Sequence, residues 1–136
     1  MAMINRHEVM RRTTFANASL YRTPEFPDRY LIGEGRAVWD EDEIDAFLLS
    51  RPRAFPGLIL EDVEITRPVR VLTEKEVMAY TSLSRSQINR MFRDCTFPAP
   101  IKLSTRKIGF LKHEFDAWLK TLRRASSSQR VHEPAE

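Results

Sequence analysis

The sequence contains two segments that resemble each other, and this internal similarity most strongly limits the possible fold. Residues 4–22 align with residues 72–90 at an offset of 68, and five positions are identical. Residues 26–48 align with residues 97–119 at an offset of 71, and six positions are identical. One gap of three residues joins the two alignments. The similarity predicts two copies of one unit, with a repeat of roughly 70 residues.

The second segment predicts two helices joined by a short turn. Thr73 and Glu76 have the spacing of a capping box and begin a helix that extends to about Tyr80. Ser84 and Gln87 repeat this spacing and begin a second helix. At about 100° per residue, the apolar residues of this second helix lie on one side and the polar residues on the other. The apolar residues are Ile88, Met91 and Phe92.

A β-hairpin and a third helix are predicted to follow. Pro98 and Pro100 are incompatible with the interior of a helix. Two β-prone pieces, near 101–103 and 107–111, flank a polar tip at 104–106. The last helix has apolar residues at i, i+3, i+4 and i+7 spacing, namely Phe115, Trp118, Leu119 and Leu122.

The first segment predicts the same order of elements. Asn5 and Glu8 stand at the start of its first helix, and Asp40 and Glu43 stand at the start of its last helix. The apolar residues of that last helix are Ile44, Phe47 and Leu48. Helix, tight turn, helix, β-hairpin and helix is the layout of a winged helix-turn-helix. We therefore expect a mainly α fold with small β-hairpins, built as a tandem winged helix-turn-helix.

The predicted domain boundaries are 3–50 for a divergent acidic copy 1, 51–70 for a partly ordered linker, 71–122 for a basic copy 2 and 123–136 for a flexible tail. A unit of about 50 residues is near the lower limit for independent folding. We therefore expect the two units, or the linker, to share buried surface. The linker residues 58–60 are too apolar for a free tether, and Val63 and Ile65 alternate with acidic residues as in a strand.

Charge is distributed unequally between the two copies. Residues 3–50 contain six basic and nine acidic residues, a net charge of −3. Residues 71–124 contain eleven basic and five acidic residues, a net charge of +6. The second copy is therefore suited to a polyanion such as DNA, and the first copy less so.

Several short motifs occur within residues 71–120. They are SRS at 84–86, an Arg at 90, the FP-x-P bend, an Arg in the hairpin and the closing E-x-D-x-W-L. With these motifs the segment resembles the small AlpA-like phage regulators and excisionases, whose fold is similar to the DNA-binding head of MerR proteins. The first copy matches through ASLYR and EIDAFL but has Ala16 where a capping Ser is usual.

The resemblance implies sequence-specific binding to double-stranded DNA by a protein of a phage or mobile element. Some members of the family activate transcription, and others act as excisionases with a tyrosine recombinase, or integrase. We expect one or both of these roles, and self-association on DNA is a further possibility. The alternative is a protein-interaction module, such as an anti-activator or an integrase-binding protein, that keeps the fold without specific DNA binding.

The polar side of the second helix of copy 2 contains the first group of candidate DNA-binding residues. Arg pairs bidentately with guanine and Asn with adenine, so Arg85, Ser86 and Asn89 are predicted to contact bases. Arg90 and Arg93 are predicted to contact phosphates. A solvated basic helix face is the alternative interpretation.

The hairpin contains the second group, Lys102, Arg106 and Lys107, which a wing places in the minor groove. Charges that only discourage edge pairing are the alternative interpretation of these residues. In copy 1 the corresponding candidates are Asn17, Tyr21, Arg22 and Arg36. For this acidic copy, a face for dimerisation or integrase binding competes with DNA contact.

The remaining residues give no pattern typical of catalysis or metal binding. Cys95 is the only cysteine, and His7, His113 and His132 lack the spacing of metal ligands. Ser126, Ser127 and Ser128 fall in the predicted tail. We therefore expect no enzyme activity, no cofactor and no metal. With one cysteine and no long apolar run, a cytoplasmic protein without membrane contact is expected.

Overall fold

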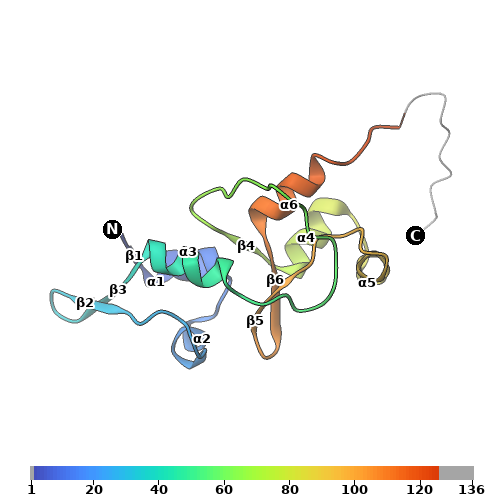
Figure 1. The fold of residues 1–136 in the computed structure, drawn as a ribbon. Helices are drawn as coiled ribbons and strands as arrows, with labels where there is room; N and C mark the ends of the chain where they lie inside the picture. The colour runs from blue at the N-terminus through green and yellow to red at the C-terminus, as the bar shows by residue number, and fades with distance from the viewer. Residues whose placement is uncertain (1, 126–136) are drawn as a thin grey trace.

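The computed structural model describes residues 2–125 (Figure 1), so most of the predicted tail, with Ser126, Ser127, Ser128 and His132, lies outside the described residues. The first half consists of β1 (Met3–Asn5), α1 (Arg6–Thr13), α2 (Asn17–Arg22), β2 (Tyr30–Ile32), β3 (Arg36–Asp40) and α3 (Glu41–Leu49). The second half consists of β4 (Val71–Leu72), α4 (Glu74–Thr81), α5 (Arg85–Arg93), β5 (Ile101–Ser104), β6 (Lys107–Leu111) and α6 (Lys112–Leu119).

The two halves have the same order of elements and the same order of strands, β1-β3-β2 and β4-β6-β5, with all neighbours antiparallel. The fold is mixed α/β, and the expectation of small two-stranded hairpins was too simple. Residues before α1 and α4 add a third strand to each sheet, where Met3 pairs with Asp40 and Val71 with Leu111. Strands of two or three residues are too short to show the alternation by which a strand is recognised in a sequence.

Capping residues explain where the helices begin. Thr73 and Ser84 each accept a hydrogen bond from the backbone N–H three residues later, and both capping boxes are complete, as predicted. Asn5 caps α1 in the same way, whereas Asp40 caps α3 through the N–H of residue 42 rather than 43. Ala16 precedes α2 and provides no side-chain cap, and α2 has six residues against nine in α5.

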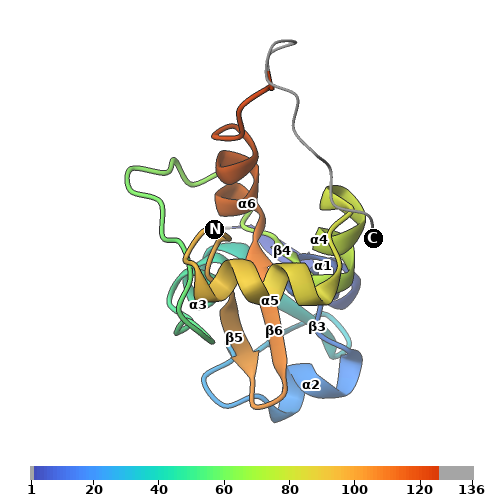
Figure 2. The same ribbon diagram turned by 90° about the vertical axis from the view of Figure 1, so that its right-hand side faces the viewer.

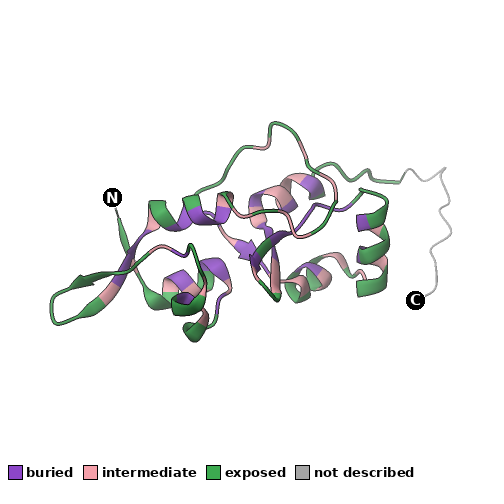
Figure 3. Cartoon of the chain, turned by 60° about the horizontal axis from the view of Figure 1, so that its bottom comes forward, coloured by how far each residue is buried: buried purple, intermediate pink, exposed green. Residues whose placement is uncertain are grey.

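The sheet β4-β6-β5 has buried residues on both faces and joins the two halves. On one face, Phe110 belongs to a core cluster with residues of α5 and α6, among them Ile88 and Trp118. On the other face, Leu103 belongs to a cluster with residues of the first half, among them Trp39. The expected shared surface is therefore a common core. Figure 3 shows the buried residues in purple concentrated along the middle of the molecule.

The beginning of the linker is an ordered segment along the outer edge of β5. The N–H of Lys102 donates to the carbonyl of Pro52 (2.8 Å), and the N–H of Ala54 donates to the carbonyl of Pro100 (2.9 Å). Arg53 forms two hydrogen bonds of 2.7 Å to the carboxylate of Glu114 in α6. These contacts attach the linker to the second half, so the segment is not a flexible tether.

Two smaller expectations are wrong. Residues around Val63 and Ile65 form no strand, and Ile65 is exposed, because residues 51–58 already occupy the available edge of β5. The apolar stripe of α6 is shorter than predicted, because the helix ends at Leu119. Leu119 and Leu122 are exposed, and only Phe115 and Trp118 of the stripe are buried.

Candidate nucleic-acid interface

Helix α5 has the two-sided character that the sequence predicts. Ile88 and Phe92 are buried in the core cluster of the second half, and Met91 is half-buried against it. The predicted contact residues on the other side are all exposed, namely Arg85, Ser86, Asn89, Arg90 and Arg93. Figure 2 shows α5 in front of the β5–β6 hairpin, so its outer side is open to a large partner.

One contact of this exposed face was not predicted. The Nε atom of Arg85 lies 2.6 Å from Oε1 of Glu74 at the start of α4. The Arg85 side chain is nevertheless 73% exposed, so the ion pair occupies one edge of the guanidinium and leaves the rest accessible. The sequence did not indicate this pair, because the two residues are on different helices and meet only through the helix-turn-helix packing.

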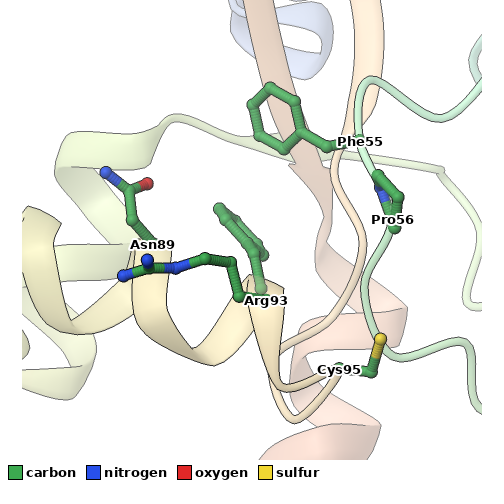
Figure 4. Close-up of a pocket in the computed structure, with 6 residues that line it drawn as sticks. Phe55, Pro56, Asn89, Arg93 and Cys95 are labelled. Carbon is green, nitrogen blue, oxygen red and sulfur yellow. The ribbon is translucent and has the colours of Figure 1, made fainter.

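The linker forms one wall of a hollow beside the C-terminal half of α5. This hollow of about 410 Å³ is lined by Phe55, Pro56, Asn89, Phe92, Arg93 and Cys95. Figure 4 shows the side chains of Asn89 and Arg93 next to each other on α5, with Phe55 facing them. The Phe55 and Phe92 rings have centroids 5.3 Å apart. The linker therefore limits how closely a partner can approach the end of α5.

The β5–β6 hairpin places its basic residues at its tip and outer side. Lys102 and Arg106 are exposed, and Lys107 is half-buried. Leu103, next to Lys102 in β5, is fully buried in the cluster that contains residues of the first half. The hairpin is therefore supported by the first half instead of projecting freely into solvent.

The tip of this hairpin lies beside α2 of the first half, at the same end of the molecule in Figures 1 and 2. A groove of about 690 Å³ separates them. Three predicted residues from different halves, Arg22, Lys102 and Arg106, line it together. Arg51 also lines it, and sequence reasoning missed this residue because it belongs to the linker.

The other candidates of the first half are exposed but are not among the residues that line this groove. Asn17 and Tyr21 are on α2, and the guanidinium of Arg29 lies 5.3 Å from the centre of the Tyr21 ring. Arg36 begins β3 in a hairpin that extends away from the second half (Figure 1). The structure therefore does not bring Arg36 together with the other predicted residues.

Residues 2–125 contain no cluster of three or more His, Cys, Asp or Glu side chains that could hold a metal ion. Burial lowers the pKa of His113, and the negative charges of Glu114 and Asp116 oppose this effect by raising it.

Among the described helices, none has the length and apolar character needed to cross a membrane.

Comparison with known proteins finds a family match for one part of the chain. Neither the curated proteins nor the solved structures contain a match. Residues 70–124 match the sequence model of the family described as Prophage CP4-57 regulatory protein (AlpA). The match covers fewer than half of the 136 residues and does not extend to residues 3–50. The segment from β4 to α6, which contains α5 and the β5–β6 hairpin, is thus similar to this prophage regulatory family.

Proposed function

We propose that the protein binds double-stranded DNA specifically and regulates a phage or mobile element, as an excisionase, as a transcriptional regulator or as both. Helix α5 reads the major groove and the β5–β6 wing contacts the flanking minor groove. The observation that carries the proposal is the outer face of α5. It exposes three guanidinium groups, a carboxamide and a hydroxyl, and residues 85–93 contain no acidic residue.

The proposal extends to the first half, as a second, divergent copy of the same winged helix-turn-helix. Two observations support this: the elements and the strands have the same order in both halves, and the two segments align in sequence. Helix α2 then occupies the position of α5, without a side-chain cap and with Arg22 as its exposed cation. The proposed partners are DNA, a tyrosine recombinase and a second copy of the chain on DNA.

A mobility-shift titration with DNA from the upstream region of the gene and from a neighbouring attachment site tests the proposal. We expect retarded complexes whose association constant falls steeply with salt, because phosphate contacts release counterions. Competition with random DNA of the same length should leave the specific complex intact. Absence of salt-dependent binding to any DNA would contradict the proposal.

A protein-interaction module is the second candidate function, and one observation favours it. Strand β2 is at the edge of its sheet and exposes three consecutive apolar residues, Tyr30, Leu31 and Ile32. Exposed edges with apolar residues are a common place for strand addition by a partner. This function becomes the preferred one if the mobility-shift titration shows no complex with DNA.

The ion pair between Glu74 and Arg85 leads to a prediction about DNA affinity. Glu74→Gln should increase affinity for DNA by up to about fivefold, because the Glu74 carboxylate no longer competes with DNA for the Arg85 guanidinium. Glu64→Gln, which removes one negative charge from the exposed part of the linker, is the matched control. Equal effects of the two substitutions in the same mobility-shift assay would show that only net charge matters.

A further inference from the structure

The groove between α2 and the β5–β6 hairpin exists only because the two halves share a core. Its walls come from three parts of the chain: α2 and the residues after it, the start of the linker, and the hairpin. Leu103 of the hairpin is fully buried in the cluster that also contains Leu20 of α2. The distance between the two walls is therefore set by packed side chains and not by a flexible connection.

Arg51 holds this junction together. Its Nε donates to the carbonyl of Lys102 (2.8 Å), and its Nη1 donates to the carboxylate of Glu25 (3.0 Å). Its guanidinium carbon lies 5.1 Å from the centre of the Phe47 ring, and only 12% of the side chain is exposed. Arg51 is a structural contact between the halves, and it also neutralises Glu25, the one acidic residue among residues 2–125 that lines the groove.

The three other cations of the groove are available to a ligand. Arg22, Lys102 and Arg106 are exposed, and within residues 2–125 none of them forms an ion pair. After Glu25 and Arg51 are paired, the groove therefore has an excess of three positive charges. A concave surface with this excess is complementary to a strand of phosphates.

The acidic character of the first half does not oppose this assignment. Five of its nine acidic residues lie within Asp40–Asp45, at the N-cap and first turns of α3. Figure 1 shows that α3 begins at the end of the first half that points away from the β5–β6 hairpin. The net charge of −3 therefore does not describe the surface around α2.

We propose that this groove binds the sugar-phosphate backbone of the same DNA duplex that α5 reads, so that both halves contact one continuous piece of DNA. The inference rests on the proposed function and adds a defined contact surface to it. Because the shared core fixes the spacing, the two halves act as one rigid body with a single extended footprint. Two modules on a flexible tether would instead tolerate variable spacing between their sites.

The double variant Arg22→Gln/Arg106→Gln tests the inference in the full-length chain. Both side chains are exposed and without an ion pair among the described residues, so the variant should fold normally, which a circular dichroism spectrum checks. Loss of two phosphate contacts should reduce the slope of log K against log salt by about 2 and weaken binding roughly 30-fold at 0.15 M salt. Specific and random DNA should be affected equally.

The control is Lys120→Gln/Arg124→Gln, which removes the same charge from the exposed end of α6 and beyond. Hydroxyl-radical footprinting completes the test: the groove variant should lose protection of one backbone segment and keep the protection given by α5. If the groove variant matches the control while the wild type binds DNA, the inference is wrong and the proposed function stands. If the wild type shows no salt-dependent DNA binding, both are wrong.

Discussion

The substitution Leu103→Ala is expected to lower the free energy of unfolding by about 2–5 kcal/mol, the usual cost of truncating a fully buried leucine. Leu103 is 0% exposed and belongs to the second half, yet it packs in the core cluster of the first half. The loss of stability should therefore appear in both halves at once. If each half had its own separate core, a cavity in one core would lower the stability of that half alone.

The two tryptophans of the chain allow this to be measured. Trp39 lies in the core cluster of the first half and Trp118 in that of the second half. Single-tryptophan backgrounds, Trp39→Phe and Trp118→Phe, then report denaturation of each half separately by fluorescence. The two transitions should coincide and move together when Leu103→Ala is added.

The exposed Leu122 provides the control, because Leu122→Ala removes the same atoms from a side chain that is 55% exposed. This control should change the free energy of unfolding by less than about 0.5 kcal/mol. Two separate transitions, of which Leu103→Ala moves only one, would contradict the shared core and with it the rigid spacing of α2 and α5.

Substitution of Arg85 or Asn89 by Ala is expected to weaken binding to the specific DNA site by roughly 1–3 kcal/mol each, with little effect on random DNA. Both residues are exposed on the outer face of α5, within its first two turns. A bidentate contact to a base discriminates among sequences, because the wrong base leaves its hydrogen-bonding groups unpaired. Dissociation constants on both DNAs, at one salt concentration, measure the difference.

Arg90→Ala is the matched comparison on the same helix. As a phosphate contact it should weaken binding to specific and random DNA by similar factors. If Arg85→Ala weakens binding to specific and random DNA by the same factor, Arg85 contacts the DNA backbone. The sequence specificity must then come from other residues of α5.

Local signals in the sequence predicted the helix starts and the character of α5 correctly. A capping box involves one side chain and a backbone N–H three residues away, so its partners are adjacent in the sequence whatever the tertiary fold. The positions of Thr73 and Ser84 as N-caps therefore follow from the sequence. The apolar face of α5 follows too, because helix geometry alone places Ile88 and Phe92 on one side.

Features that depend on partners distant in the sequence were predicted poorly. The strands β1 and β4 have three and two residues, and each is defined by a partner in β3 or β6 more than 30 positions away. Alternation around Val63 and Ile65 predicted a strand, but the edge of β5 was already paired with the start of the linker. The periodicity of a short segment cannot show that another segment already pairs with the same strand edge.

The sequence by itself determined the two similar halves, the order of their helices and the basic outer face of α5, because these depend on spacing within a few residues. The sequence led us to expect buried surface shared by the units or the linker, but only the tertiary structure decided which residues form the common core, that Arg51 joins the halves and that Arg22, Lys102 and Arg106 line one groove. The physical reason is that an apolar residue in a strand, such as Leu103, predicts burial but not the surface that buries it. The residues next to Leu103 in the sequence do not indicate which half it packs against.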